Sequence, residues 1–129
     1  MNDELIDRLR LVRTAGIGPI TFRQLIQRFG GAGAALDALP DLARRGGGKA
    51  PRIASRDEAE REISAVEKLG AHYLVLGQGL YPNLLSALED APPLLMAKGE
   101  LALLDRPAVA MVGARNASAA ACRFARGLA

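Results

Sequence analysis

The chain has 129 residues, of which half are apolar and 24% are charged, and its formal net charge is +3. This length fits one domain, or one small domain with part of a second, and the composition excludes a disordered polyelectrolyte. No apolar run can cross a bilayer, and the acidic start at residues 1–4 lacks the features of a secretory signal. We therefore expect a cytoplasmic protein of bacterial type that does not enter a membrane.

Residues 1–54 are expected to be mostly helical. Apolar residues recur at helical spacing over 5–12 and over 22–29, and a glycine-rich break at 15–19 separates the two segments. Two short helical pieces, at 34–38 and 40–45, are expected to follow. The next segment, with its glycine triplet at residues 46–48, is typical of a flexible turn.

A further helix is expected to begin at Ser55 and to end at Gly70. Ser55 and Glu58 have the spacing of a capping box, in which each residue satisfies a backbone N–H of the other. Ala59, Ile63 and Val66 form the apolar stripe of this helix. The first 69 residues are therefore expected to form one helical domain of the helix-hairpin-helix or SAM-like type.

The pattern changes after residue 70. Short apolar runs at 72–76, 94–97 and 109–112 indicate strands, and a helical turn is expected within 81–88. The continuous run at 109–112 is typical of a strand buried on both faces of a parallel sheet. A helix with an inward apolar face is expected over 118–129.

The expected fold class is thus a helical domain followed by the start of a Rossmann-like α/β domain, over residues 70–129. A buried parallel strand needs neighbours, and the helix after it should return to another strand. Because the sequence stops inside that helix, we expect an N-terminal piece of a longer protein. Such a piece should leave a strand edge exposed.

The break between the first two helices is a candidate nucleic-acid contact. Gly16 and Gly18 allow a tight turn, and Ile17 is expected to fill the gap between the helices. Backbone N–H groups at the following helix start could bind a phosphate, with Arg13 and Arg23 on either side. A plain helical hairpin or a protein-binding module remains an alternative.

The turn after residues 109–112 is the second candidate site. Ligands of open α/β sheets bind at the carboxyl ends of strands. Gly113 would let the backbone approach an anion, Arg115 offers a planar cation suited to phosphate, and Ser118 can cap the next helix. We predict DNA phosphate binding here, although an ordinary turn with a solvated arginine is the alternative.

The sequence offers few residues for a disulfide, a metal site or catalysis. Cys122 is the single cysteine, so no intrachain disulfide or thiolate cluster can form, and it is expected to pack in a helix. His72 is the single histidine, which leaves no multi-histidine metal site. No segment completes a dinucleotide or P-loop pattern. We predict no catalytic residue, no metal and no cofactor.

Charge is uneven along the chain. Residues 1–56 carry +5, residues 57–105 carry −6, and residues 106–129 carry +4. Two basic ends around an acidic middle indicate two surfaces that bind anionic partners. The alternative is that the arginines only keep an alanine-rich chain solvated. Because five residues in all are aromatic, base stacking cannot supply most of the affinity for nucleic acid, which should rest on phosphates and weaken with salt.

Four segments in order resemble the DprA/Smf family of DNA-processing proteins. Residues 9–29 resemble its N-terminal helical domain, and 81–85 resemble its Tyr-Pro-x-x-Leu segment. Residues 92–99 resemble its Pro-Pro-x-Leu-x-x-x-Gly segment. Residues 109–118 resemble the start of its Rossmann-like core, with the Gly-x-Arg motif as Gly113-Ala114-Arg115.

The resemblance implies a protein without catalytic activity that binds single-stranded DNA and loads the recombinase RecA during natural transformation or recombination. The phosphate contact of the family's motif arginine carries over to Arg115, with Gly113 and Ser118 beside it. The chain departs from the family at Ala120-Ala121, where Tyr-Gly is frequent. The resemblance also implies a homodimer formed through regions beyond Ala129.

Two other functions remain open from the sequence. A nucleotide-processing enzyme could use the same Rossmann-like pocket for a mononucleotide phosphate, with a catalytic acid further along. Alternatively, residues 1–69 could be purely a protein-interaction module.

Overall fold

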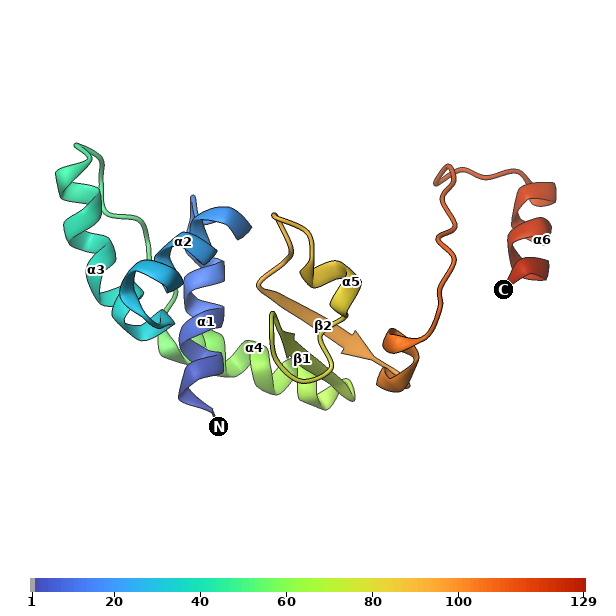
Figure 1. Ribbon diagram of the computed structural model, residues 1–129, viewed down its shortest axis with the longest axis horizontal. Helices are drawn as coiled ribbons and strands as arrows, with labels where there is room; N and C mark the ends of the chain where they lie inside the picture. The colour runs from blue at the N-terminus through green and yellow to red at the C-terminus, as the bar shows by residue number, and fades with distance from the viewer. Residues whose placement is uncertain (1) are drawn as a thin grey trace.

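The computed structural model describes residues 2–129. In chain order its elements are α1 (Asp3–Arg13), α2 (Pro19–Phe29), α3 (Ala32–Arg45), α4 (Arg56–Lys68), β1 (Ala71–Val75), α5 (Asn83–Ser86), β2 (Leu94–Lys98), the 3-10 helix η1 (Leu101–Asp105) and α6 (Ala119–Leu128). Helices α1 to α4 and the two strands form one body, and α6 lies apart from it at the end of an extended segment (Figure 1).

Helices α1, α2 and α3 enclose the first apolar core. Each contributes the residues that recur on one face, as the helical spacing predicts. The buried members are Leu11, Phe22, Leu25, Ala32, Ala35, Leu36 and Leu39. Ile17, in the loop between α1 and α2, packs against this cluster, as expected for a residue that fills the gap between two helices.

The expectation of two separate helical pieces around Pro40 is wrong. A single helix, α3, runs through Pro40. Proline inside a helix removes one hydrogen bond and costs about 3 kcal/mol. Burial of Ala35, Leu36 and Leu39 against α1 and α2 offsets that cost, since tertiary packing overrides intrinsic propensity.

A second core joins the helices to the sheet. Ile6 and Leu9 of α1 pack with Ala59 and Ile63 of α4, and the side chains of Tyr73 and Leu94 cover this cluster from the sheet. An isolated two-stranded sheet is marginal in water, so this helical support stabilises it. The predicted division between residues 69 and 70 runs through this packed region and stays a prediction.

The two strands expected at 72–76 and 94–97 are confirmed as β1 and β2, and they pair antiparallel. Tyr73 lies opposite Met96, and Leu74 lies opposite Leu95. The parallel sheet that the later apolar run predicted does not form among residues 2–129, where these two strands make up the one sheet.

The expectation of a strand at 109–112 is also wrong. These residues are extended but unpaired, with Val109 91% and Val112 98% exposed. A continuous apolar run predicts burial only where neighbouring strands and helices cover it, and no described element does so here. The apolar face of α6 is likewise open, since Phe124 is 71% exposed and Cys122 is exposed rather than packed in a core. The expected order, a helical domain followed by a small region of strands and helices, is therefore confirmed, whereas the Rossmann-like start is not confirmed.

Candidate nucleic-acid interface

The turn before α6 presents the predicted phosphate-binding residues to solvent. Ser118 is the N-cap of α6, and its Oγ accepts a hydrogen bond from the backbone N–H of Ala121 at 3.1 Å. The predicted cap is thus confirmed, and it fixes where the extended segment becomes a helix. The first turn of α6 contains no acidic side chain that would repel an anion.

Arg115 lies in the turn itself, three residues before this cap, and is exposed. None of the ion pairs formed by residues 2–129 includes it, so its charge is not neutralised by a neighbouring carboxylate. At Gly113 an added Cβ would meet nothing within 4 Å, which leaves the backbone open to an approaching ligand. The structure therefore groups Gly113, Arg115 and Ser118 in one short exposed segment.

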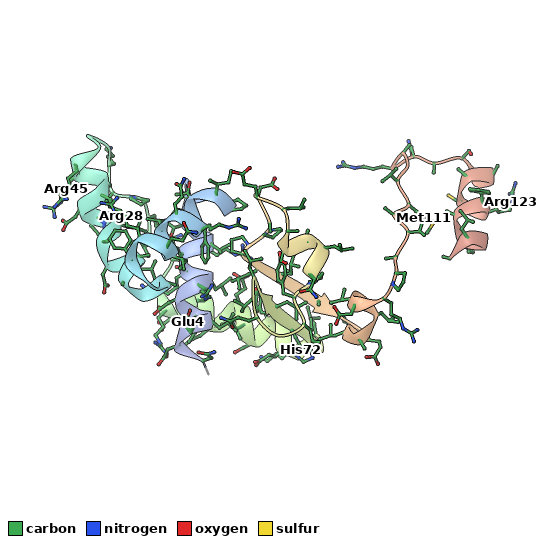
Figure 2. All side chains as sticks on the ribbon, in the orientation of Figure 1. Glu4, Arg28, Arg45, His72, Met111 and Arg123 are labelled. Atoms are coloured by element: carbon green, nitrogen blue, oxygen red, sulfur yellow. The ribbon has the colours of Figure 1, made fainter. Side chains whose placement is uncertain are left out.

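A hollow of about 560 Å³ lies beside this turn, between the extended segment and α6. Apolar side chains such as Met111, Phe124 and Leu128 line most of it, together with the backbone at Gly113. Arg123 lies on the side of α6 away from the extended segment (Figure 2). The hollow thus offers an apolar wall, and no arginine is among the residues that line it.

The α1–α2 connection has the geometry of a helical hairpin. Thr14 ends α1, is 2% exposed, and donates its hydroxyl to the Arg10 carbonyl at 2.8 Å. Gly16 adopts a φ of 82°, a conformation that favours glycine. Gly18 is the N-cap of α2 and Pro19 follows it, with no side chain of the described residues capping this helix. The first N–H groups of α2 are therefore left to solvent or to a ligand.

The two hairpin arginines differ in their partners. Arg13 donates from Nε to Glu62 Oε2 at 3.0 Å and from Nη2 to Glu62 Oε1 at 2.6 Å. Arg23 instead donates to the Leu88 carbonyl at 3.2 Å, a neutral acceptor, and takes part in none of the ion pairs found within 2–129. The charge of Arg13 is therefore balanced by a neighbouring carboxylate, whereas that of Arg23 is not.

Tyr73 completes the environment of Glu62. Its hydroxyl donates to Glu62 Oε1 at 2.6 Å, so the carboxylate receives bonds from both α1 and β1. The Arg13 hydrogen bonds hold the pKa of Glu62 below its usual range. Burial, together with the bond to Glu62, raises the pKa of Tyr73 to about 12. No local sequence signal identified Glu62 or Tyr73, because their partners lie far along the chain.

Tyr81 has a packing role in this structure. It is 4% exposed, and its hydroxyl donates to the Pro92 carbonyl at 2.7 Å, which closes the loop between β1 and β2. The Arg23–Leu88 contact ties the same loop to α2. A base could not stack on Tyr81 without unfolding this loop.

The structure does not bring the two candidate sites together. The hairpin lies in the helical body and the turn at 113–118 lies beyond the far side of the sheet (Figure 1). Arg28 and Arg45 lie at one end of the molecule and Arg123 at the other, so the basic regions are separated in space as well as in sequence (Figure 2). Within residues 2–129 no group of His, Cys, Asp and Glu side chains could hold a metal ion.

Among residues 2–129, no helix is long and apolar enough to cross a membrane.

Two family models match the sequence. Residues 2–65 match the DprA-like N-terminal HHH domain, and residues 72–129 match DNA recombination-mediator protein A. The first match agrees with the helix-hairpin-helix prediction. No curated protein matches the chain.

Proposed function

Because the chain belongs to the DprA family, whose second domain is that of a DNA recombination mediator, we propose that it binds single-stranded DNA without sequence preference and helps to load the recombinase RecA onto it. Its part in recombination and DNA processing follows from the family. The strand type, the partner and the contact residues are the proposal. We also propose that the protein is a cytoplasmic homodimer and performs no catalysis.

One observation carries the proposed contact. Arg115 is exposed, lacks a carboxylate partner among the described residues, and lies between the open backbone at Gly113 and the helix cap at Ser118. A guanidinium can donate two parallel hydrogen bonds to a phosphate, and helix N-termini favour anions. The hairpin glycines Gly16 and Gly18, with Arg23, supply a second phosphate contact in this proposal.

A phosphate-based contact accounts for the lack of sequence preference. Phosphate oxygens carry no base information, and the aromatic residues that could stack on bases are few. Tyr73 and Tyr81 already use their hydroxyls within the fold. Affinity should therefore come mainly from displaced counterions and decrease steeply with salt.

The test is a fluorescence-anisotropy titration of a labelled thymine oligonucleotide with the full chain at several salt concentrations. Arg115→Ala should weaken binding and reduce the slope of log K against log salt by about 0.7, the loss of one single-strand phosphate contact. Arg126→Ala is the matched control, because it removes the same charge from the opposite end of α6. Equal effects of the two substitutions would refute the proposed site.

Two further measurements examine the rest of the proposal. Formation of RecA filaments on the oligonucleotide, followed with and without the chain, tests the loading role, and no acceleration would contradict it. A mononucleotide that competes more strongly than the oligonucleotide would favour a nucleotide-processing enzyme instead.

A further inference from the structure

The Arg13–Glu62 pair bears directly on how the hairpin could contact nucleic acid. We propose that Glu62 holds Arg13 out of contact with phosphate, so that Arg23 and the backbone of the hairpin turn bind DNA without it. This inference rests on the proposed DNA-binding function and adds to it a residue that limits the binding strength. Glu62 acts through Arg13 and is a positioning residue in this account.

The geometry of the pair makes Arg13 a poor phosphate ligand. Two nitrogens of its guanidinium already bond to the two oxygens of one carboxylate, at 3.0 and 2.6 Å. This paired geometry is the strongest that an arginine and a carboxylate form. A phosphate that approached Arg13 would have to displace Glu62 or tolerate its negative charge nearby.

Tyr73 strengthens this arrangement from the other side. Its hydroxyl donates to the Glu62 oxygen that Arg13 Nη2 also contacts. Tyr73 belongs to β1 and packs on the second core, whereas Glu62 belongs to α4. The carboxylate is therefore fixed by two elements that do not belong to the hairpin, and Arg13 is drawn toward α4.

Among residues 2–129, the hollow beside Glu62 is lined by no unpaired cation. A hollow of about 240 Å³ lies here, lined by Arg13, Arg52, Ala54, Glu58, Ala59 and Glu62. Arg52 pairs with Glu58 at 2.5 Å, so both arginines of this hollow are matched by carboxylates. This part of the surface is electrically balanced and should attract DNA weakly, in contrast to the side of the hairpin at Arg23.

The decisive variant is Glu62→Gln, with Glu67→Gln as its matched control. Both changes remove one negative charge from α4, but Glu67 is exposed and takes part in none of the ion pairs described. In the oligonucleotide titration, Glu62→Gln should tighten binding about fivefold at 50 mM salt and raise the salt slope by about 0.7. Glu67→Gln should give a clearly smaller gain.

The double variant Arg13→Ala/Glu62→Gln locates the source of that gain. If the freed Arg13 is responsible, the double variant returns to the wild-type salt slope. An undiminished gain in the double variant would overturn the proposal. Tyr73→Phe removes no charge and leaves both Arg13–Glu62 hydrogen bonds in place, so it should leave the salt slope unchanged.

A measurement on the wild-type chain does not depend on how any variant folds. The side-chain Nε–H resonance of Arg13, followed by NMR during addition of the oligonucleotide, should stay in place while that of Arg23 moves. Equal movement of both resonances would show that Glu62 does not withhold Arg13.

The results separate this inference from the proposed function. If Arg115→Ala weakens binding but Glu62→Gln equals Glu67→Gln, the DNA-binding proposal stands and this inference is wrong. If Arg115→Ala has no effect and Glu62→Gln tightens binding as expected, the inference stands and the Arg115 site is wrong. Failure of both the wild type and Glu62→Gln to bind the oligonucleotide overturns both.

Discussion

Ser55 and Glu58 exchange hydrogen bonds across the first turn of α4. The Glu58 backbone N–H donates to Ser55 Oγ at 3.1 Å, and the Ser55 N–H donates to Glu58 Oε2 at 2.7 Å. Two N–H groups that the helix itself cannot satisfy are thereby paired. The start of α4 is thus fixed by local chemistry on an exposed surface, and this helix then supports the sheet.

The capping box leads to the first prediction. Ser55→Ala should lower the free energy of unfolding by about 1 kcal/mol, because the Glu58 N–H loses its acceptor. Ser64→Ala is the control: it makes the same chemical change within α4, where alanine is the better helix former, and should be neutral or slightly stabilising. Urea denaturation measures both, and equal effects would argue against the cap.

The second prediction concerns the core that joins α1 and α4 to the sheet. Leu9 is fully buried in it, and Leu9→Ala should lower the free energy of unfolding by about 2–5 kcal/mol through lost burial and a residual cavity. Leu84→Ala removes the same atoms from a side chain that is 91% exposed, so its effect should stay within about 0.5 kcal/mol. Thermal or urea unfolding checks the difference.

Local patterns predicted the features that depend on neighbouring residues. The helical spacing identified α1 and α2, the Ser55–Glu58 spacing identified the start of α4, and the Ser118 cap identified α6. Each of these signals lies within a few positions of the chain and needs no distant partner. The two short strands also followed from local apolar runs.

The errors arose where distant contacts decide the outcome. α3 continues through Pro40 because α1 and α2 cover its apolar face. Residues 109–112 remain unpaired because strand formation depends on neighbours that the pattern of one segment cannot specify. Arg13 pairs with Glu62, 49 positions away, so its neutralisation had no signal in the hairpin sequence.

The third prediction concerns alkaline pH. Burial and the bond to Glu62 raise the pKa of Tyr73 from its usual value near 10 to about 12. The neutral phenol is thus favoured in the folded state, so its contribution to stability is complete below pH 10 and is lost as the pH rises toward 12. Ultraviolet titration of the phenolate should show this late ionisation, and Tyr73→Phe should remove it.

Glu62→Gln offers a check on the cause of that shift. Because part of the shift comes from the carboxylate, the substitution should move the pKa of Tyr73 back toward 10. A Tyr73 pKa that stays near 12 in Glu62→Gln would assign the shift to burial alone.

The fourth prediction concerns the unpaired segment before the Arg115 turn. Val112 is 98% exposed, so Val112→Asp should change the free energy of unfolding by no more than about 0.5 kcal/mol. Val66→Asp is the matched comparison, because Val66 is 5% exposed in α4 and an unpaired buried carboxylate should cost several kcal/mol. Amide hydrogen exchange supplies a second reading, in which residues 109–112 exchange rapidly while the amides of α4 are protected. Strong destabilisation by Val112→Asp, or slow exchange at 109–112, would mean that this apolar run is a covered strand after all, and that the turn carrying Arg115 is positioned by a sheet.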